Sequence, residues 1–192
     1  MTAIGWQLPD PTDGGMWIEN PSRSGGVAIN GQEQNVGTAS PRLRAQWTIP
    51  LRNAAEITQA RRTIAKLRGK ANSVLMPIFE PKKGRTGNVQ AAAALRATTI
   101  DVTLTTGPAP EHGRHFGIAN SNRVYIAIDI THVSGSHYQM TFQPPLRVAA
   151  DIGDTVHWDD ALLEMNLTED QTPIPLTVMR YATLDLSLVE AW

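Results

Sequence analysis

The segment Glu111-His112-Gly113-Arg114-His115 holds side chains that could bind a metal ion. Its two histidines stand three residues apart, whereas the pair that binds zinc in many proteases stands four residues apart on one face of a helix. The prolines and glycines around this segment do not favour a helix. The segment therefore does not predict a zinc site.

A second group of possible ligands lies between residues 151 and 160. Its carboxylates and single imidazole do not follow the regular ligand positions of a calcium-binding loop. Aspartates that form turns beside a short strand explain the pattern more simply. We therefore predict no metal ion and no cofactor. The group consists of Asp151, Asp154, His157, Asp159 and Asp160.

Patterns typical of catalysis are weak in this sequence. His132 and His137 flank Ser134-Gly135, which predicts a hairpin connection. No serine stands in a Gly-x-Ser-x-Gly turn, and no glycine-rich turn leads into the expected helix. Asp159 and Asp160 could act as paired carboxylates, but adjacent residues on a strand point to opposite faces. We predict that the protein is not an enzyme.

Composition limits the class of protein further. With 192 residues, 41% of them hydrophobic, the chain can build one domain or a compact pair. It has no cysteine, which excludes disulfides and is compatible with a reducing cytosol. No apolar run approaches the roughly 20 residues that cross a bilayer, and the N-terminal segment does not resemble a signal peptide. We expect no membrane partner and no export signal.

Charge is distributed unevenly along the chain. Residues 1–100 contain 13 Lys or Arg and 6 Asp or Glu, whereas residues 101–192 contain 4 and 12. The two halves therefore carry formal charges of +7 and −8. Three explanations fit this asymmetry: the two ends of the molecule face different partners, a basic face of one copy meets an acidic face of another, or solvated residues cluster by chance.

The elements that must position these side chains are mostly strands. Apolar residues alternate with polar ones in 43–49, 100–104, 124–130, 138–142, 163–167 and 184–188, which is typical of antiparallel strands. One helix is expected at about 53–68: Asn53 can cap it, Glu56 stands at the capping-box position, and Gly69 can end it. We predict a mainly β fold, a β-sandwich or β-barrel of antiparallel strands with one flanking α-helix.

The sequence also suggests how the chain is divided. Residues 1–40 are rich in turn formers such as Asp13-Gly14-Gly15 and Asn30-Gly31, which predicts an N-terminal arm with short hairpins. Residues 41–192 then form a β-rich domain with the helix, with a possible division into two β subdomains near 81–97. This arm contains Trp6 and Trp17 without a regular alternation of apolar residues around them. The two tryptophans must be buried either against the chain's own core or against a neighbouring subunit.

Two blocks of sequence show a characteristic order of elements. In residues 47–79 a strand leads into a helix that ends at Leu67-Arg68-Gly69 and is followed by an apolar strand. In residues 123–169 a strand, the turn Pro144-Pro145-Leu146-Arg147 and the stretch GDTVHWDDALLEMNL follow in order. These blocks resemble the minor tail proteins of long-tailed bacteriophages. Among them the chain is most similar to the distal tail protein group, whose N-terminal domain has the tail-tube fold, a β-sandwich flanked by a helix. The resemblance covers residues 41–170.

This resemblance implies a structural virion protein assembled in the host cytoplasm. It implies a ring, most simply of six copies, that joins the end of the tail tube to the tail-tip hub. Its partners would be the tail tube protein, the hub protein and the tape measure protein, and DNA would pass through the lumen without sequence-specific binding. Another ring component, a tube or terminator subunit, is an alternative.

The expected subunit interface combines the arm with charged residues of both halves. A basic strip on the helix would meet aspartates of the next copy. The expected residues are Trp6, Trp17, Arg61, Arg62, Lys66, Arg68, Asp151, Asp154, Asp159 and Asp160. The competing function is a carbohydrate-binding β-sandwich, in which Trp6, Trp17 or Trp158 would stack on a sugar ring.

Overall fold

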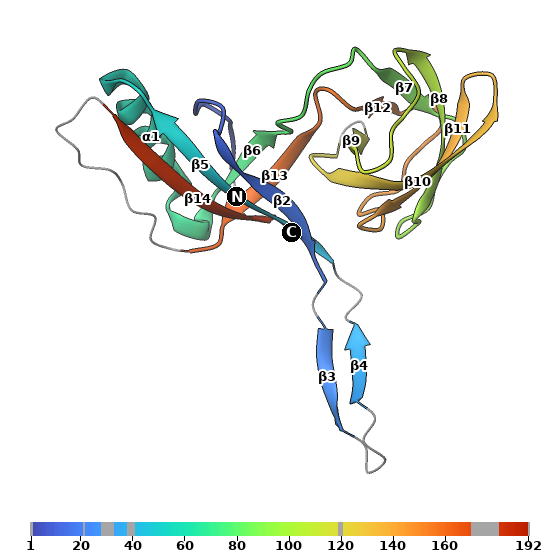
Figure 1. Ribbon diagram of the computed structural model, residues 1–192, viewed down its shortest axis with the longest axis horizontal. Helices are drawn as coiled ribbons and strands as arrows, with labels where there is room; N and C mark the ends of the chain where they lie inside the picture. The colour runs from blue at the N-terminus through green and yellow to red at the C-terminus, as the bar shows by residue number, and fades with distance from the viewer. Residues whose placement is uncertain are drawn as a thin grey trace.

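The computed structural model describes residues 2–20, 22–27, 33–37, 41–118, 121–169 and 181–191, with 22–27 and 33–37 described as backbone alone. The described chain forms two β units and a projecting two-stranded hairpin (Figure 1). The fold class expected from the sequence is therefore confirmed.

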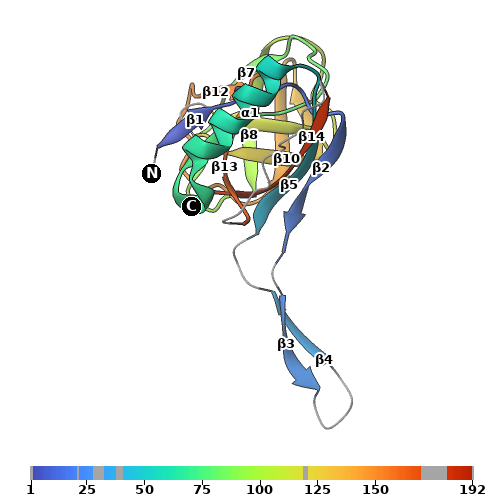
Figure 2. The same cartoon turned by 90° about the vertical axis from the view of Figure 1, so that its left-hand side faces the viewer.

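The first unit is a six-stranded sheet covered by helix α1 (Ala54–Leu67), which crosses its face in Figure 2. Strand β1 runs parallel to β6, and the other neighbouring strands are antiparallel. The strands lie in the order β1 (Ala3–Gly5), β6 (Ser73–Pro77), β13 (Leu162–Leu167), β14 (Ala182–Glu190), β5 (Arg42–Leu51) and β2 (Asp13–Glu19).

Helix α1 begins as its sequence predicts. Asn53 accepts a hydrogen bond from the Glu56 backbone N–H at 2.9 Å. The Glu56 carboxylate accepts in return from the backbone N–H of Arg52, at 2.6 Å, and from the Asn53 side-chain amide. At the other end Arg68 itself takes the left-handed conformation, with φ 50°, before Gly69 begins the short 3-10 turn Gly69–Ala71. The helix therefore ends one residue earlier than the glycine suggests.

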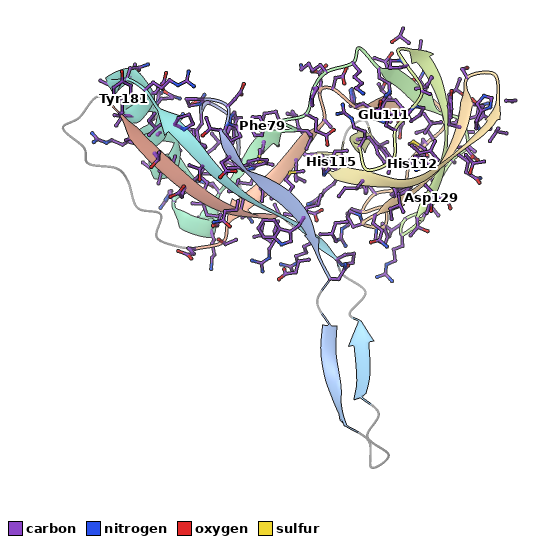
Figure 3. All side chains as sticks on the ribbon, viewed as in Figure 1. Phe79, Glu111, His112, His115, Asp129 and Tyr181 are labelled. Atoms are coloured by element: carbon purple, nitrogen blue, oxygen red, sulfur yellow. The ribbon has the colours of Figure 1, made fainter. Side chains whose placement is uncertain are left out.

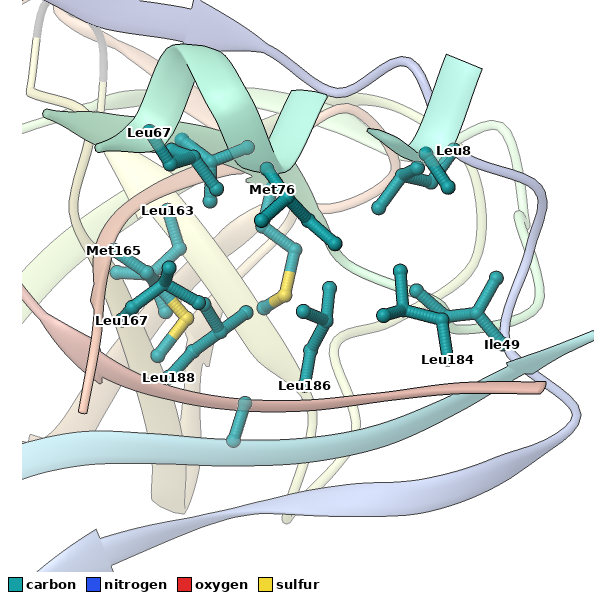
Figure 4. Packing of buried hydrophobic residues seen from close by; sticks show 14 of the residues in the cluster. Leu8, Ile49, Leu67, Met76, Leu163, Met165, Leu167, Leu184, Leu186 and Leu188 are labelled. Atoms are coloured by element: carbon teal, nitrogen blue, oxygen red, sulfur yellow. The ribbon is translucent and has the colours of Figure 1, made fainter. Parts of the chain in front are cut away.

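The core of this unit lies between α1 and the sheet, and Figure 4 shows its packing. Alternate residues of the central strands point toward the helix, which is why their sequence alternates. The helix contributes the side chains that recur every three or four residues. The core includes Leu43, Ile49, Ile57, Ile64, Leu67, Met76, Leu163, Met165, Leu184, Leu186 and Leu188.

The second unit is a closed six-stranded barrel inserted between β6 and β13. Its interior is a separate apolar core centred on four aromatic rings, Phe116, Tyr125, Phe142 and Trp158. Around the barrel the strands are β10 (Val124–Ser134), β11 (His137–Gln143), β8 (Thr99–Thr106), β7 (Thr86–Val89), β12 (Thr155–His157) and β9 (His115–Ile118).

The expected N-terminal arm is shorter than 40 residues. Strands β1 and β2 belong to the sheet, so only β3 (Ser22–Val27) and β4 (Glu33–Gly37) project from it. Asp13-Gly14-Gly15 lies within β2 and is not a turn. Glycine is required there because a Cβ on Gly14, whose φ is +126°, would lie 2.0 Å from the Gln46 carbonyl oxygen. The turn expected at Asn30-Gly31 lies outside the described residues. Since the barrel starts at Thr86, the expected division near 81–97 overlaps its first strand.

The buried face of α1 offers a direct test of this packing. Ile64→Asp places a carboxylate without a partner in the core, because Ile64 is only 7% exposed. We expect a loss of about 3 to 5 kcal/mol in the free energy of unfolding, measured by urea denaturation. Ala65→Asp, at the exposed neighbouring position, is the matched control and should change stability little. Equal losses in the two variants would contradict the assigned packing.

Candidate functional site

The face of the sheet turned away from α1 is polar. Because antiparallel partners share a face, Trp17 lies opposite Arg44, and Asp185 opposite Thr48. Thr48 donates a hydrogen bond to Asp185 at 2.7 Å, and Arg44 forms an ion pair with Glu19 at 2.6 Å. The same face carries Arg42 opposite Glu19 and Val189 opposite Arg44. Its other polar side chains include Asp13, Gln46, Thr183 and Ser187.

Both edges of this sheet are open within the part of the chain that the structure describes. The edge strands are β1, with three residues, and β2, with seven. Each presents backbone N–H and C=O groups that another strand could pair with. A sheet with two different free edges can be extended from copy to copy.

A buried carboxylate joins the sheet, the barrel and the root of the hairpin. Glu190, at the end of β14, is 3% exposed and accepts a hydrogen bond from the Leu43 backbone N–H at 3.2 Å. Two barrel arginines approach the same carboxylate: Arg123 at 3.3 Å and Arg147 at 3.8 Å. We call these three charged residues the Glu190 cluster.

The arginines of the Glu190 cluster also bind backbone carbonyls of the first unit. Arg123 donates to the Ala191 carbonyl, and Arg147 donates to the carbonyl of Pro41, directly before β5. The backbone N–H of Arg147 lies 3.3 Å from the Tyr125 hydroxyl oxygen, to which it donates. The hairpin root is therefore tied both to the sheet and to the barrel. The sequence carries no signal for this cluster, because its members lie far apart in the chain.

The segment Glu111–His115, whose side chains did not predict a metal site, makes structural contacts at the junction of the two units (Figure 3). His115 binds Glu80 at 2.5 Å, and Arg114 pairs with the other oxygen of Glu80 at 3.0 Å. Glu111 pairs with Lys83, and His112 lies 2.9 Å from the Ile128 carbonyl oxygen. Among the described residues, no group of three or more His, Asp or Glu side chains is arranged to hold a metal ion.

Two opposing effects act on Glu80. Burial raises the pKa of this carboxyl group, but the hydrogen bond with His115 and the charges of His115 and Arg114 outweigh burial. The pKa therefore lies below its ordinary value of 4.5. Glu80 is held ionised at the point where the chain passes from the sheet to the barrel.

The aspartates expected at the interface are partly used within the chain. Asp159 accepts hydrogen bonds from the backbone N–H groups of Lys83, Gly84 and Arg85. Burial raises its pKa, but these bonds outweigh burial and lower the pKa below its usual value. Asp160 pairs with Lys82 at 2.6 Å on the exposed surface.

Asp154 accepts from the backbone N–H of Asp151 at 2.9 Å and closes a turn, while Asp151 is exposed. The basic strip lies on α1, on the other unit from these aspartates. Arg62 and Arg68 are exposed, and Arg61 and Lys66 are half-buried. Contact between the strip and the aspartates of another copy stays a prediction.

The tryptophans differ in how much they expose. Trp6 is half-buried and meets Phe79 edge to face, with ring centroids 5.5 Å apart. Trp158 is 1% exposed inside the barrel, under the buried side chain of Arg85. Trp17 is 46% exposed on the outer face of the sheet. Of the three expected sugar platforms, only Trp17 presents much of its ring to solvent.

No helix of the described residues has both the length and the apolar character needed to cross a membrane. A scan against known protein families finds no matching family model, and a search of curated proteins finds no match. The geometry of the chain itself is therefore the basis for assigning its function.

The Glu190 cluster generates the first prediction about this site. Glu190→Gln keeps the shape of the side chain but removes the charge that faces two arginines. We expect the free energy of unfolding to fall by about 1 to 3 kcal/mol, measured by urea denaturation. Asp185→Asn, at an exposed position of the same strand, should stay within about 0.5 kcal/mol of the parent. Similar losses in both would show that Glu190 has no special role.

The stability of the protein should depend on pH through Glu80. Because the pKa of Glu80 is lowered by folding, its ionised form stabilises the protein above pH 4.5, and this contribution is lost as pH falls through the lower folded value. The parent should therefore melt higher than Glu80→Gln at neutral pH, and the two melting temperatures should converge below pH 4.5. A constant gap from pH 7 to pH 3 would contradict this assignment.

Proposed function

We propose that this chain is a structural subunit of a bacteriophage tail that forms a ring at the distal end of the tail tube and connects the tube to the tail-tip hub. The observation that carries the proposal is the projecting hairpin of β3 and β4. Six copies are the ring size that the resemblance to distal tail proteins implies.

The hairpin is a two-stranded element whose register runs from Ser22 opposite Gly37 to Val27 opposite Glu33. Figures 1 and 2 show it extending away from both β units. Isolated two-stranded hairpins are marginally stable in water, so a surface outside this part of the chain is needed to hold it. A neighbouring copy supplies such a surface in a ring.

The polar face of the sheet supports the same function. It carries carboxylates such as Asp13 and Asp185, and its Arg44 is neutralised by Glu19. A face rich in unpaired Lys and Arg would bind the phosphates of DNA strongly. A face of small polar and acidic side chains instead lets DNA and the tape measure protein pass without being held.

The open edges of the sheet favour a ring over a symmetric dimer. The β1 edge of one copy and the β2 edge of the next are different surfaces, so their pairing is head to tail. Head-to-tail contacts close into a ring when the rotation between copies permits it. The tail tube and hub proteins would then bind the two ends of that ring.

Carbohydrate binding is the second candidate function, and one observation favours it. Trp17 borders a hollow of about 360 Å³ that is also lined by Arg44, Gln46, Glu169 and Ser187. An exposed indole beside hydrogen-bonding side chains suits a sugar ring. Glycan-array binding by the parent that is abolished in Trp17→Ala would favour this function.

The ring function predicts the effect of removing the hairpin. Glu19 at the end of β2 and Arg42 at the start of β5 are directly opposite each other in the sheet. A short loop can therefore join the two strands when residues 21–40 are replaced by Gly-Gly. We expect the parent to form rings in negative-stain images and the shortened variant to be monomeric by light scattering. Its melting temperature should stay close to that of the parent, because the lost contacts are between copies. A parent that sediments as a monomer at every concentration, alone and with the tail tube protein, would overturn the proposal.

A further inference from the structure

One end of the barrel exposes a group of apolar side chains. Three of the largest are Leu95, Val148 and Ile152, which are 58%, 56% and 71% exposed. Around them lie the exposed methyl groups of four alanines. We call this surface the rim patch, and it consists of Ala91, Ala92, Ala94, Leu95, Val148, Ala149 and Ile152.

The rim patch is contiguous because its two loops are bonded to each other. Ala93 and Ala150 exchange both backbone hydrogen bonds at 2.9 Å. Further along, Arg96 donates to the Leu146 carbonyl, and Leu146 donates to the Ala97 carbonyl, both at 2.9 Å. Leu95 and Val148 lie between these two sets of bonds. The exposed side chains are therefore held side by side on an ordered backbone.

Two further features distinguish the rim patch from scattered apolar residues. Arg96 has a φ of 69°, an uncommon conformation for a residue with a side chain, directly after Leu95. The alanines 91–94 line a hollow of about 240 Å³, together with Asp101 and Gln139. Apolar side chains beside a hollow are typical of a surface that another chain covers.

The Glu190 cluster fixes the rim patch relative to the hairpin. Arg147 stands between Leu146 and Val148 in the patch loop and donates to the carbonyl of Pro41 at the hairpin root. In Figure 1 both barrel loops lie at the lower rim, on the side toward which the hairpin projects. The hairpin points away from the barrel, so it does not cover the patch of its own copy.

We propose that the rim patch receives the β3–β4 hairpin of a second copy of this chain. This proposal rests on the ring function and names the surface that holds the hairpin. A hairpin without a partner and an apolar surface without a cover occur in the same described chain. Donor and acceptor are different surfaces, so each copy both gives and receives a hairpin, as a closed ring requires.

The first experiment removes the apolar side chains. The triple variant Leu95→Ser, Val148→Ser, Ile152→Ser should need at least about a tenfold higher concentration to assemble, measured by light scattering, because apolar area is no longer removed from water on contact. Its melting temperature as a monomer should not fall, since all three side chains are exposed. The matched control is Val133→Ser, which alters a side chain 53% exposed on β10 and should assemble like the parent.

The second experiment identifies the occupant by mixing two defective chains. The triple variant keeps its hairpin, and the chain with residues 21–40 replaced by Gly-Gly keeps its rim patch. At the lowest concentration at which the parent assembles, each variant alone should be monomeric, while the mixture should give a 1:1 heterodimer by native mass spectrometry. The heterodimer cannot grow, because its one hairpin and its one intact rim patch are already bound to each other.

The outcomes separate this inference from the proposed function. Rings formed by the triple variant at the parental concentration would overturn the rim patch and leave the ring function standing. Monomeric variants that form no heterodimer on mixing would overturn the hairpin as occupant. A parent that never assembles would overturn both proposals.

Discussion

The ionic contact at Glu190 is the constraint on which the arrangement of this molecule depends. Most apolar burial lies within one unit or the other, and Val124 and Ile126 of the barrel strand β10 also pack with the core of the sheet. The carboxylate of Glu190 meets Arg123 and Arg147 at a buried position. Few water molecules can reach it to solvate a charge that has lost its partner. Such a contact adds little net stability, but it penalises any arrangement that leaves one of its charges buried alone. It therefore acts mainly to select one geometry.

The second joint between the units lies near Glu80, where the chain passes from β6 into the barrel and returns from β12 to β13. There Glu80, Arg114 and His115 form a compact ionic group, while Asp159 accepts three backbone N–H groups of the adjoining loop. Backbone groups held by a side chain keep this loop from needing a strand partner. The barrel is thus inserted into the sheet unit through two short, fixed connections and is not attached by a flexible linker.

These joints bear on the proposed assembly because the loop that carries Val148 of the rim patch also binds the hairpin root, through Arg147 and Pro41. In the proposed ring, a neighbour that binds the hairpin also restrains its root at Pro41. The hydrogen bond from Arg147 to the Pro41 carbonyl connects that root to the barrel. A ring subunit needs such rigidity, since small errors in angle accumulate from copy to copy and prevent closure. In the proposed ring, the polar outer face of the sheet would line the lumen only where the hairpin and the barrel leave it uncovered.

The sequence by itself determined the local structure. Alternation in 43–49 and 184–188 predicted strands with one buried face, and Asn53 and Glu56 predicted the start of the helix, because these features depend on neighbours within a few residues. It did not predict that β1 and β2 join the sheet, since Asp13-Gly14-Gly15 favours a turn locally and only the close approach of β5 explains glycine there. Nor could it indicate the Glu190 cluster, in which Arg123 and Glu190 are 67 residues apart, or the rim patch, which joins residues 91–95 to residues 148–152. Only the tertiary structure brought these residues together, because pairing between distant segments is decided by the whole packed chain.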